Sequence, residues 1–500
     1  MTLSLDILPC ELVYRILDHL NIITIILSCR NVCTRLNAII NTYSRYQTIA
    51  ELDLQQNDID SNDSKYIAAA LQNNDTLTTL NLYANNIGSQ GLQYLANALH
   101  HNRALKILNL GQNNIDSEGV QYLAKALQIN RTLTQLNLYS NQINSMGISY
   151  LAEALQHNQT LTTLNFTCNP FSGDRFKYMA NALANNKTLT DLNLTWNELG
   201  VKGRLQYLAS ALEKNHTLIN LDLGHNHINC QGMEYLANGL QNNQALRSLS
   251  LDCNDVGSEG AQYLANALQH NTTLTMLNLS HNPIHNEGAQ YLAKALENNA
   301  TLTSLCLMST SIGFEGTRAL YAGLRNNRTL TSLNLWEIPI CSQGAQYLAN
   351  LLQTNSITLT ILSMGINGIG PKGAQYIAKA LEKNNTLKTL QLSVNGICAE
   401  GTQYLANALI HNKALTMLGL ASNRIDTEGV RYLANALLNN ITLTTLDIAG
   451  NTIGLEGVRC LVNALLTLET LKFGNSNTPE EERQYMIDVS HYLTANVICD

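Results

Sequence analysis

The residues best suited to metal chemistry are two histidine pairs, His225 with His227 and His281 with His285. Imidazole is a common zinc ligand, but a zinc site takes three or four ligands at characteristic spacings. Neither pair has a cysteine, histidine or aspartate partner at such a spacing. No serine–histidine–aspartate or cysteine–histidine set stands out either. The sequence therefore predicts no metal site, no cofactor and no enzymatic activity.

One glycine pattern is of the kind that binds phosphates. Gly368, Gly370 and Gly373 match the dinucleotide fingerprint G-x-G-x-x-G, in which glycines let the backbone approach a pyrophosphate. The acidic residue about 20 positions later in a βαβ unit is missing. Asn367, Ile369 and Gly373 also occupy the Asn, Ile and Gly positions of a repeat that runs through the chain. We therefore interpret the pattern as part of that repeat.

The pattern Y-L-A-x-A-L-x-x-N-x-T-L-x-x-L-x-L-x-x-N recurs along the chain, for example in residues 121–141 and 261–282. We take the first leucine of each L-x-L as an anchor; twelve of the spacings between anchors are 28 residues and two are 29. The anchors are Leu52, Leu80, Leu108, Leu136, Leu164, Leu192, Leu221, Leu249, Leu277, Leu305, Leu333, Leu362, Leu390, Leu418 and Leu446. This period is typical of leucine-rich repeats.

The physical chemistry of one repeat is readable at residues 274–296. Leu277 and Leu279 alternate with period two, which predicts a short strand with one buried face. Asn282 follows where the chain turns, and stacked repeats would align such residues in an asparagine ladder. A helix is expected from Gly288, with one face formed by Ala289, Leu292, Ala293 and Leu296 directed at the strands. Tyr291 recurs in most repeats, which indicates a structural residue.

These repeats resemble the ribonuclease-inhibitor-like subfamily of leucine-rich repeats, and the resemblance covers residues 48–475. It implies an α/β solenoid shaped as a horseshoe, with parallel strands on the concave side and helices on the convex side. Residues 471–473 are expected to form a final strand. We expect residues 476–500 to be a capping helix, with Thr478 as N-cap, Pro479 in the first turn and Glu480–Glu482 at the positive end of the helix dipole.

Residues 1–47 do not fit the repeat and resemble an F-box, which implies a small all-α module. The matching segments are Leu8-Pro9-x-Glu11-Leu12, Ile16-Leu17-x-x-Leu20 and Val32-Cys33-x-Arg35. The chain departs from the F-box pattern in having Asn21-Ile22 instead of Asp-Pro, a longer gap before Val32, and Leu36 instead of tryptophan. The alternative is a plain helical cap for the solenoid.

The F-box resemblance implies a substrate-recognition subunit of a Skp–cullin–F-box ubiquitin ligase. Its F-box would bind the Skp-type adaptor, and through it the cullin core. The adaptor-binding residues implied are Leu8, Pro9, Leu12, Ile16, Leu17 and Leu20. One alternative is a stand-alone scaffold, inhibitor or NOD-like sensor built on leucine-rich repeats. Another is a GTPase activator like that of Ran, for which no catalytic arginine stands out.

The expected concave face comprises the positions one before and one, three and four after each anchor. None of these 60 positions holds lysine or arginine, and seven are acidic. The acidic ones are Glu51, Asp53, Asp191, Asp222, Asp252, Glu337 and Asp447. Such a face favours a basic or neutral protein partner. The predicted partner-binding residues are Tyr83, Tyr139, Trp196, Asp222, Asp252, Trp336 and Glu337. The alternative is a polar strand layer that only maintains solubility.

Charge and composition narrow the classes of partner. The net charge of −7 argues against nucleic acid, whose binding depends on many Lys and Arg contacts to phosphates. No window reaches about 18 apolar residues, so we expect no membrane span. The N-terminus lacks the basic and apolar regions of a signal peptide. Eleven cysteines without C-x-x-C pairs favour reduced thiols, and hence a cytoplasmic or nuclear location.

Overall fold

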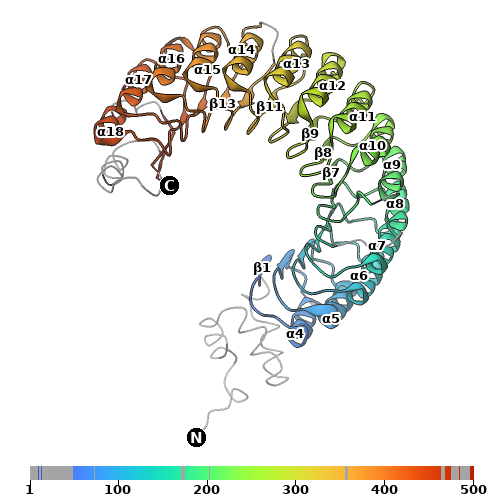
Figure 1. Ribbon diagram of the computed structural model, residues 1–500. Coiled ribbons are helices and arrows are strands. Elements are labelled where there is room, and N and C mark those ends of the chain that lie inside the picture. The colour runs from blue at the N-terminus through green and yellow to red at the C-terminus, as the bar shows by residue number, and fades with distance from the viewer. Residues whose placement is uncertain are drawn as a thin grey trace. The chain divides into compact units, whose positions relative to one another are not determined.

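The computed structural model describes residues 10, 13, 49–72, 74–169, 175–201, 203–354, 358–462, 468–474, 484 and 496–499. The described residues form two compact units. The first lies within Met1–His227 and Asn238–Arg247, and the second within Ile228–Ala237 and Ser248–Asp500. In each unit, strands form one layer on the inner side of a curve and helices form a second layer outside it (Figure 1).

The strands are short and follow one another at the repeat interval. The first unit contains β1 (Glu51–Asp53), β2 (Thr79–Asn81), β3 (Ile107–Asn109), β4 (Gln135–Asn137), β5 (Thr163–Asn165), β6 (Asp191–Asn193) and β7 (Asn220–Asp222). The second contains β8 (Ser248–Ser250), β9 (Met276–Asn278), β10 (Ser304–Cys306), β11 (Ser332–Asn334), β12 (Ile361–Ser363), β13 (Thr389–Gln391), β14 (Met417–Gly419), β15 (Thr445–Asp447), β16 (Thr470–Phe473) and β17 (Asn496–Cys499).

All strand pairs within a unit are parallel and join consecutive strands. Leu52 is aligned with Leu80 in the first unit, and Leu277 with Leu305 in the second. Every predicted anchor leucine is the middle residue of one of β1–β15, and almost all are fully buried. The predicted α/β fold with a parallel sheet is therefore confirmed.

The helices lie between the strands in sequence. The first unit contains α4 (Ser61–Gln72), α5 (Gly88–His101), α6 (Ser117–Ile129), α7 (Ser145–His157), α8 (Phe176–Asn185) and α9 (Arg204–Lys214), while α10 (Cys230–Asn242) has residues in both units. The second contains α11 (Ser258–Leu268), α12 (His285–Asn298), α13 (Phe314–Leu324), α14 (Cys341–Leu352), α15 (Gly370–Leu381), α16 (Cys398–His411), α17 (Thr427–Leu437) and α18 (Gly454–Val462). Among the described helices, none has the length and apolar character needed to cross a bilayer.

Helix α12 shows how the core of a repeat is built. The four predicted residues at 289, 292, 293 and 296 are all buried. The prediction that the helix begins at Gly288 is wrong, because α12 begins at His285. Gly288 instead allows close packing, since a Cβ atom there would lie 2.7 Å from Ile284 Cγ2 and 3.1 Å from Ala261 Cβ.

The predicted asparagine ladder is confirmed. Asn141 Oδ1 accepts hydrogen bonds from the backbone N–H groups of Asn113 and Ile115 in the preceding repeat, at 3.1 and 3.0 Å. Its Nδ2 donates to the carbonyls of Leu110 and Leu138, both at 3.0 Å. The side chain thus satisfies backbone groups that the turns would otherwise bury unpaired. The ladder is interrupted at Thr310 and Ile338.

A second asparagine ladder, which the sequence analysis missed, follows the helices. Asn102 Nδ2 donates to the carbonyls of Leu71 and Asn74 at 2.8 and 2.9 Å, and its Oδ1 accepts from the N–H of Leu105 at 2.8 Å. The buried members are Asn102, Asn130, Asn158, Asn186, Asn215, Asn243, Asn271, Asn299, Asn327, Asn384, Asn412 and Asn440. The N-x-T triplets of the repeat therefore encode a structural side chain.

Beyond the repeats, the structure describes two strands and one helical residue near the C-terminus and two helical residues near the N-terminus. Leu471 is the buried second residue of β16, as expected for a final strand. The predicted capping helix is wrong for residues 496–499, which form β17 and pair in parallel with β16. Gln484 is helical, and the rest of residues 475–495 lies outside the described residues. Near the N-terminus, Cys10 and Val13 are helical, with Val13 buried.

We expect Asn141→Ala to lower the free energy of unfolding by about 3 kcal/mol, because it leaves buried N–H and C=O groups unpaired. Denaturant unfolding followed by circular dichroism measures this loss. The matched control is Asn57→Ala, which changes the same repeat position at the first, exposed rung of the ladder. A loss of similar size at both positions would contradict the structural role of the buried ladder.

Candidate functional site

The inner layer of each unit presents a surface that we call the strand face, made of the positions one before and one, three and four after each anchor. The position four after the anchor has positive φ in all fifteen repeats; for example, φ is 59° at Trp196 and 56° at Glu337. The backbone N–H groups of Trp196 and Glu337 donate to the carbonyls of Gly224 and Gly365, each in the next repeat, at 3.1 and 2.8 Å. These bonds hold an otherwise uncommon backbone conformation, so the side chains project from a fixed position.

Two of the predicted aromatic residues come together in the first unit. Tyr83 and Tyr139 belong to alternate repeats, yet their rings are stacked with centroids 6.4 Å apart. The repeat between them has Gly111, where a Cβ atom would lie 3.0 Å from Tyr83 Cδ2 and 3.4 Å from Tyr139 Cβ. The glycine thus leaves the space in which the two rings meet.

Trp196, also in the first unit, stacks on His225 with ring centroids 4.1 Å apart and an angle of 10° between the planes. It remains 52% exposed, so a large part of the indole is available to a partner. Asp222 lies next to Trp196, because both residues hydrogen-bond to Gly224. The Gly224 N–H donates to Asp222 Oδ1 at 3.0 Å, and the Gly224 carbonyl accepts a hydrogen bond from the Trp196 N–H. The sequence analysis predicted the tryptophan and the aspartate but missed the histidine.

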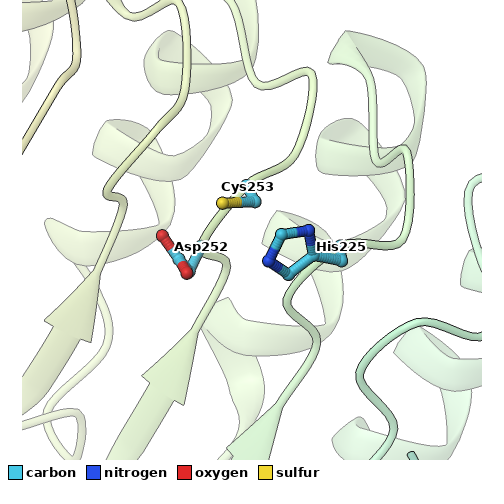
Figure 2. Close-up of side chains that lie close together, drawn as sticks. All are labelled: His225, Asp252 and Cys253. Atoms are coloured by element: carbon cyan, nitrogen blue, oxygen red, sulfur yellow. The ribbon is translucent and has the colours of Figure 1, made fainter. Parts of the chain in front are cut away.

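Asp252 and Cys253 follow β8 in the second unit, and Figure 2 shows both side chains at the end of that strand. Asp252 Oδ1 is buried and accepts no hydrogen bond from the described residues. Partial burial, followed by the negative charge of the neighbouring Asp252, raises the pKa of Cys253 to about 11. His225, also labelled in Figure 2, belongs to the first unit.

Trp336 and Glu337 are neighbours in the second unit whose side chains extend toward different repeats. The indole of Trp336 lies on Gly365, where a Cβ atom would be 2.5 Å from Cη2 and Cζ3 of the ring. Glu337 Oε2 instead accepts a hydrogen bond from Ser309 Oγ at 2.6 Å, toward the preceding repeat. The tryptophan therefore forms a flat apolar surface, with a carboxylate to one side.

The ion pairs that the structure describes lie on the helices and not on the strand faces. The ion pairs within the described residues join Arg318 to Glu315, Arg431 to Glu428 and Arg459 to Glu456, each within one helix. None of them includes a strand-face carboxylate. The described cysteines form no disulfide. All six predicted adaptor-binding residues lie outside the described residues: Leu8, Pro9, Leu12, Ile16, Leu17 and Leu20.

Comparison with protein families agrees with the repeat and its N-terminal neighbour. Residues 5–48 match the F-box domain. Segments that together span just over half of the chain match the Leucine Rich repeat family: 73–96, 101–124, 130–152, 157–174, 185–205, 214–237, 242–265, 270–293, 355–378, 383–406 and 439–462. The chain belongs to the leucine-rich-repeat family and carries an F-box domain. These two modules define a protein-interaction adaptor.

No curated protein matches the chain. Solved structures similar to it include TLR13 in the TLR13–ssRNA13 complex, with 18% identity, a TM-score of 0.46, and coverage of 81% of this chain and 60% of that one. An internalin (inlF) from Listeria monocytogenes is 16% identical, with a TM-score of 0.38 and coverage of 91% and 98%. The actin-binding site 2 of leiomodin-1 is 26% identical, with a TM-score of 0.27 and coverage of 31% and 88%. The chain thus spans less than two thirds of the length of TLR13.

We expect the Cys253 thiol to react with iodoacetamide at pH 8 about a hundredfold more slowly than free N-acetylcysteine. Its raised pKa leaves a correspondingly smaller fraction of reactive thiolate. Mass spectrometry of the alkylated peptide over time measures the rate. Asp252→Asn removes the neighbouring charge but not the burial, so it should speed the reaction. Equal rates for Cys253 and N-acetylcysteine would contradict the raised pKa.

Proposed function

We propose that this protein is the substrate-recognition subunit of a Skp–cullin–F-box ubiquitin ligase. The observation that carries the proposal is the F-box match at residues 5–48, directly before the repeats. In this role the F-box binds a Skp-type adaptor, and the strand faces hold a protein substrate. The protein itself makes and breaks no bond; it raises the effective concentration of the substrate near the ligase.

The character of the strand faces supports a protein partner of basic or neutral charge. Four carboxylates of the first unit, Glu51, Asp53, Asp191 and Asp222, share the face with no lysine or arginine at its positions. Such a field attracts basic segments and repels acidic ones, including nucleic acid. Large aromatic side chains that remain accessible, such as Trp196, are the type most often found at the centre of binding interfaces.

The adaptor-binding part of the proposal is tested with the full chain and purified Skp-type adaptor. We expect the combined change Leu8→Ala, Pro9→Ala and Ile16→Ala to reduce binding at least tenfold, because it truncates apolar residues of the F-box motif. The control truncates the same number of apolar side chains at Ile129, Ile410 and Leu438, which are exposed on or next to the helices. No binding of the unchanged chain at micromolar adaptor would favour a stand-alone scaffold.

The substrate-binding part of the proposal predicts that Trp196→Ala and Trp336→Ala each weaken binding of the protein substrate by about 2 kcal/mol, which is roughly thirtyfold in Kd. Isothermal titration of each purified variant with that partner measures the loss. Phe314→Ala is the matched control, since Phe314 is an exposed aromatic residue of helix α13. Losses below about 0.5 kcal/mol for both tryptophans would remove them as anchors of the partner.

A further inference from the structure

The strand face of the second unit contains a continuous series of apolar residues, which we call the apolar strip. It comprises Met308, Trp336, Gly365, Ile366 and Val394, from the turns that follow β10, β11, β12 and β13. Ile366 and Val394 are each 43% exposed. The residues of the strip lie three or four positions after the anchor leucine, and at those positions the other repeats carry mostly polar or small residues. Met308 and Trp336 are half-buried and Gly365 is buried. Exposed apolar side chains in consecutive repeats, as at Ile366 and Val394, are of the kind that marks an interaction site.

The backbone under the strip is held in an unfavourable conformation. Ile366 and Val394 have φ values of 55° and 57°. Positive φ is rare for β-branched residues, because their side chains crowd the backbone in that region. The conformation is maintained by backbone hydrogen bonds from their N–H groups to the carbonyls of Ser393 and Ala421, at 2.9 and 2.8 Å. Displaying two β-branched apolar side chains at such positions costs stability, which indicates a function for them.

Two further departures from the repeat occur in this region. The repeats that carry Met308 and Trp336 are those in which Thr310 and Ile338 interrupt the asparagine ladder. Gly365 is the residue on which the indole of Trp336 lies, so the ring forms part of a flat surface. The changes that separate these repeats from their neighbours therefore surround the apolar strip.

Charge and spacing define the chemistry of the occupant. Glu337 is exposed beside Trp336, and no strand-face position from β8 to β15 carries a lysine or arginine. Adjacent parallel strands lie about 4.8 Å apart, so two repeats span roughly 10 Å, which three residues of an extended chain cover. An extended segment that crosses the strands could therefore place an apolar side chain on the strip and a basic residue near Glu337.

We propose that the apolar strip anchors an extended segment of a protein partner, in which an aliphatic or aromatic residue lies within about three positions of a lysine or arginine. The proposal rests on the proposed role of the strand faces in binding partners, but not on adaptor binding by the F-box. Trp336, Ile366 and Val394 contact the apolar residue, and Glu337 selects the basic one. Gly365 is a positioning residue, which acts by letting the indole lie flat.

The test uses a display library of random eight-residue peptides, selected on the full chain, followed by titration of synthetic peptides from the enriched set. The two tryptophans of the chain are Trp196 and Trp336, so in a Trp196→Phe background the fluorescence of Trp336 reports binding at the strip. We expect the enriched peptides to combine an apolar residue with a nearby basic one and to change the Trp336 emission. Enrichment of acidic peptides, or binding without a Trp336 signal, would overturn the proposal.

Gly365→Ala is the sharpest variant, because the added methyl group displaces the indole and changes no charge. We expect it to weaken peptide binding at least tenfold. The matched control is Gly257→Ala, since a Cβ atom at Gly257 meets nothing within 4 Å. Equal binding by the two variants would contradict the positioning role of Gly365. If Gly365→Ala lowers the thermal unfolding midpoint, Val394→Ala replaces it, with the same expected loss.

Glu337→Gln separates the two parts of the proposed recognition. We expect it to abolish the preference for lysine or arginine over a neutral residue, while the preference for an apolar residue remains. An unchanged basic preference would remove Glu337 from the site. Adaptor binding is measured on every variant in parallel. A variant that loses peptide binding but still binds the adaptor shows an effect at the strip alone. If the unchanged chain does not bind the adaptor, only the proposed ligase role is contradicted.

Discussion

The structure depends on the need to satisfy buried backbone N–H and C=O groups in turns that have no regular secondary structure of their own. Asn141 accepts from two N–H groups of the preceding repeat and donates to carbonyls of that repeat and its own. Asn102 satisfies carbonyls in the same way on the helix side. A single repeat would leave these groups unpaired, so each repeat is stable only between neighbours.

Because each repeat depends on its neighbours, only some positions of the repeat are free to vary and so to determine which partner binds. The leucines, both asparagine positions and the small residues between helices are fixed by packing, and they recur with little change. The strand face is not fixed in this way, and its composition differs between regions. The first unit displays carboxylates with Trp196 and the Tyr83–Tyr139 pair, whereas the second displays the apolar strip around Trp336. The two units therefore offer a partner different chemistry.

Glycines next to the aromatic residues explain how a regular scaffold presents flat rings. Gly111 lies between the stacked rings of Tyr83 and Tyr139, and Gly365 lies under the indole of Trp336. A side chain at either glycine would occupy the space of the ring. The binding character of a strand-face position thus depends on the residue 28 or 29 positions away as much as on its own type. An adaptor can change its partner by such paired substitutions without altering its core.

The sequence by itself determined the features that depend on local pattern: the strands β1–β15 on the anchor leucines, the buried face of α12 and the asparagine ladder that follows the strands. It did not predict β17, because residues 496–499 lie beyond the last repeat and pair with β16. It placed the start of α12 at Gly288, whereas the helix begins at His285. The glycine is needed inside the helix because a Cβ atom there would crowd Ala261 of the neighbouring helix, and the sequence alone does not show that contact. It also missed the stacking of Trp196 on His225 and the placement of the half-buried Cys253 thiol beside Asp252, which raises the pKa of the thiol. These features join residues of different repeats or depend on the positive φ of the turns. Only the register of stacked repeats decides them, since periodicity fixes what each repeat buries but not which side chains meet across repeats.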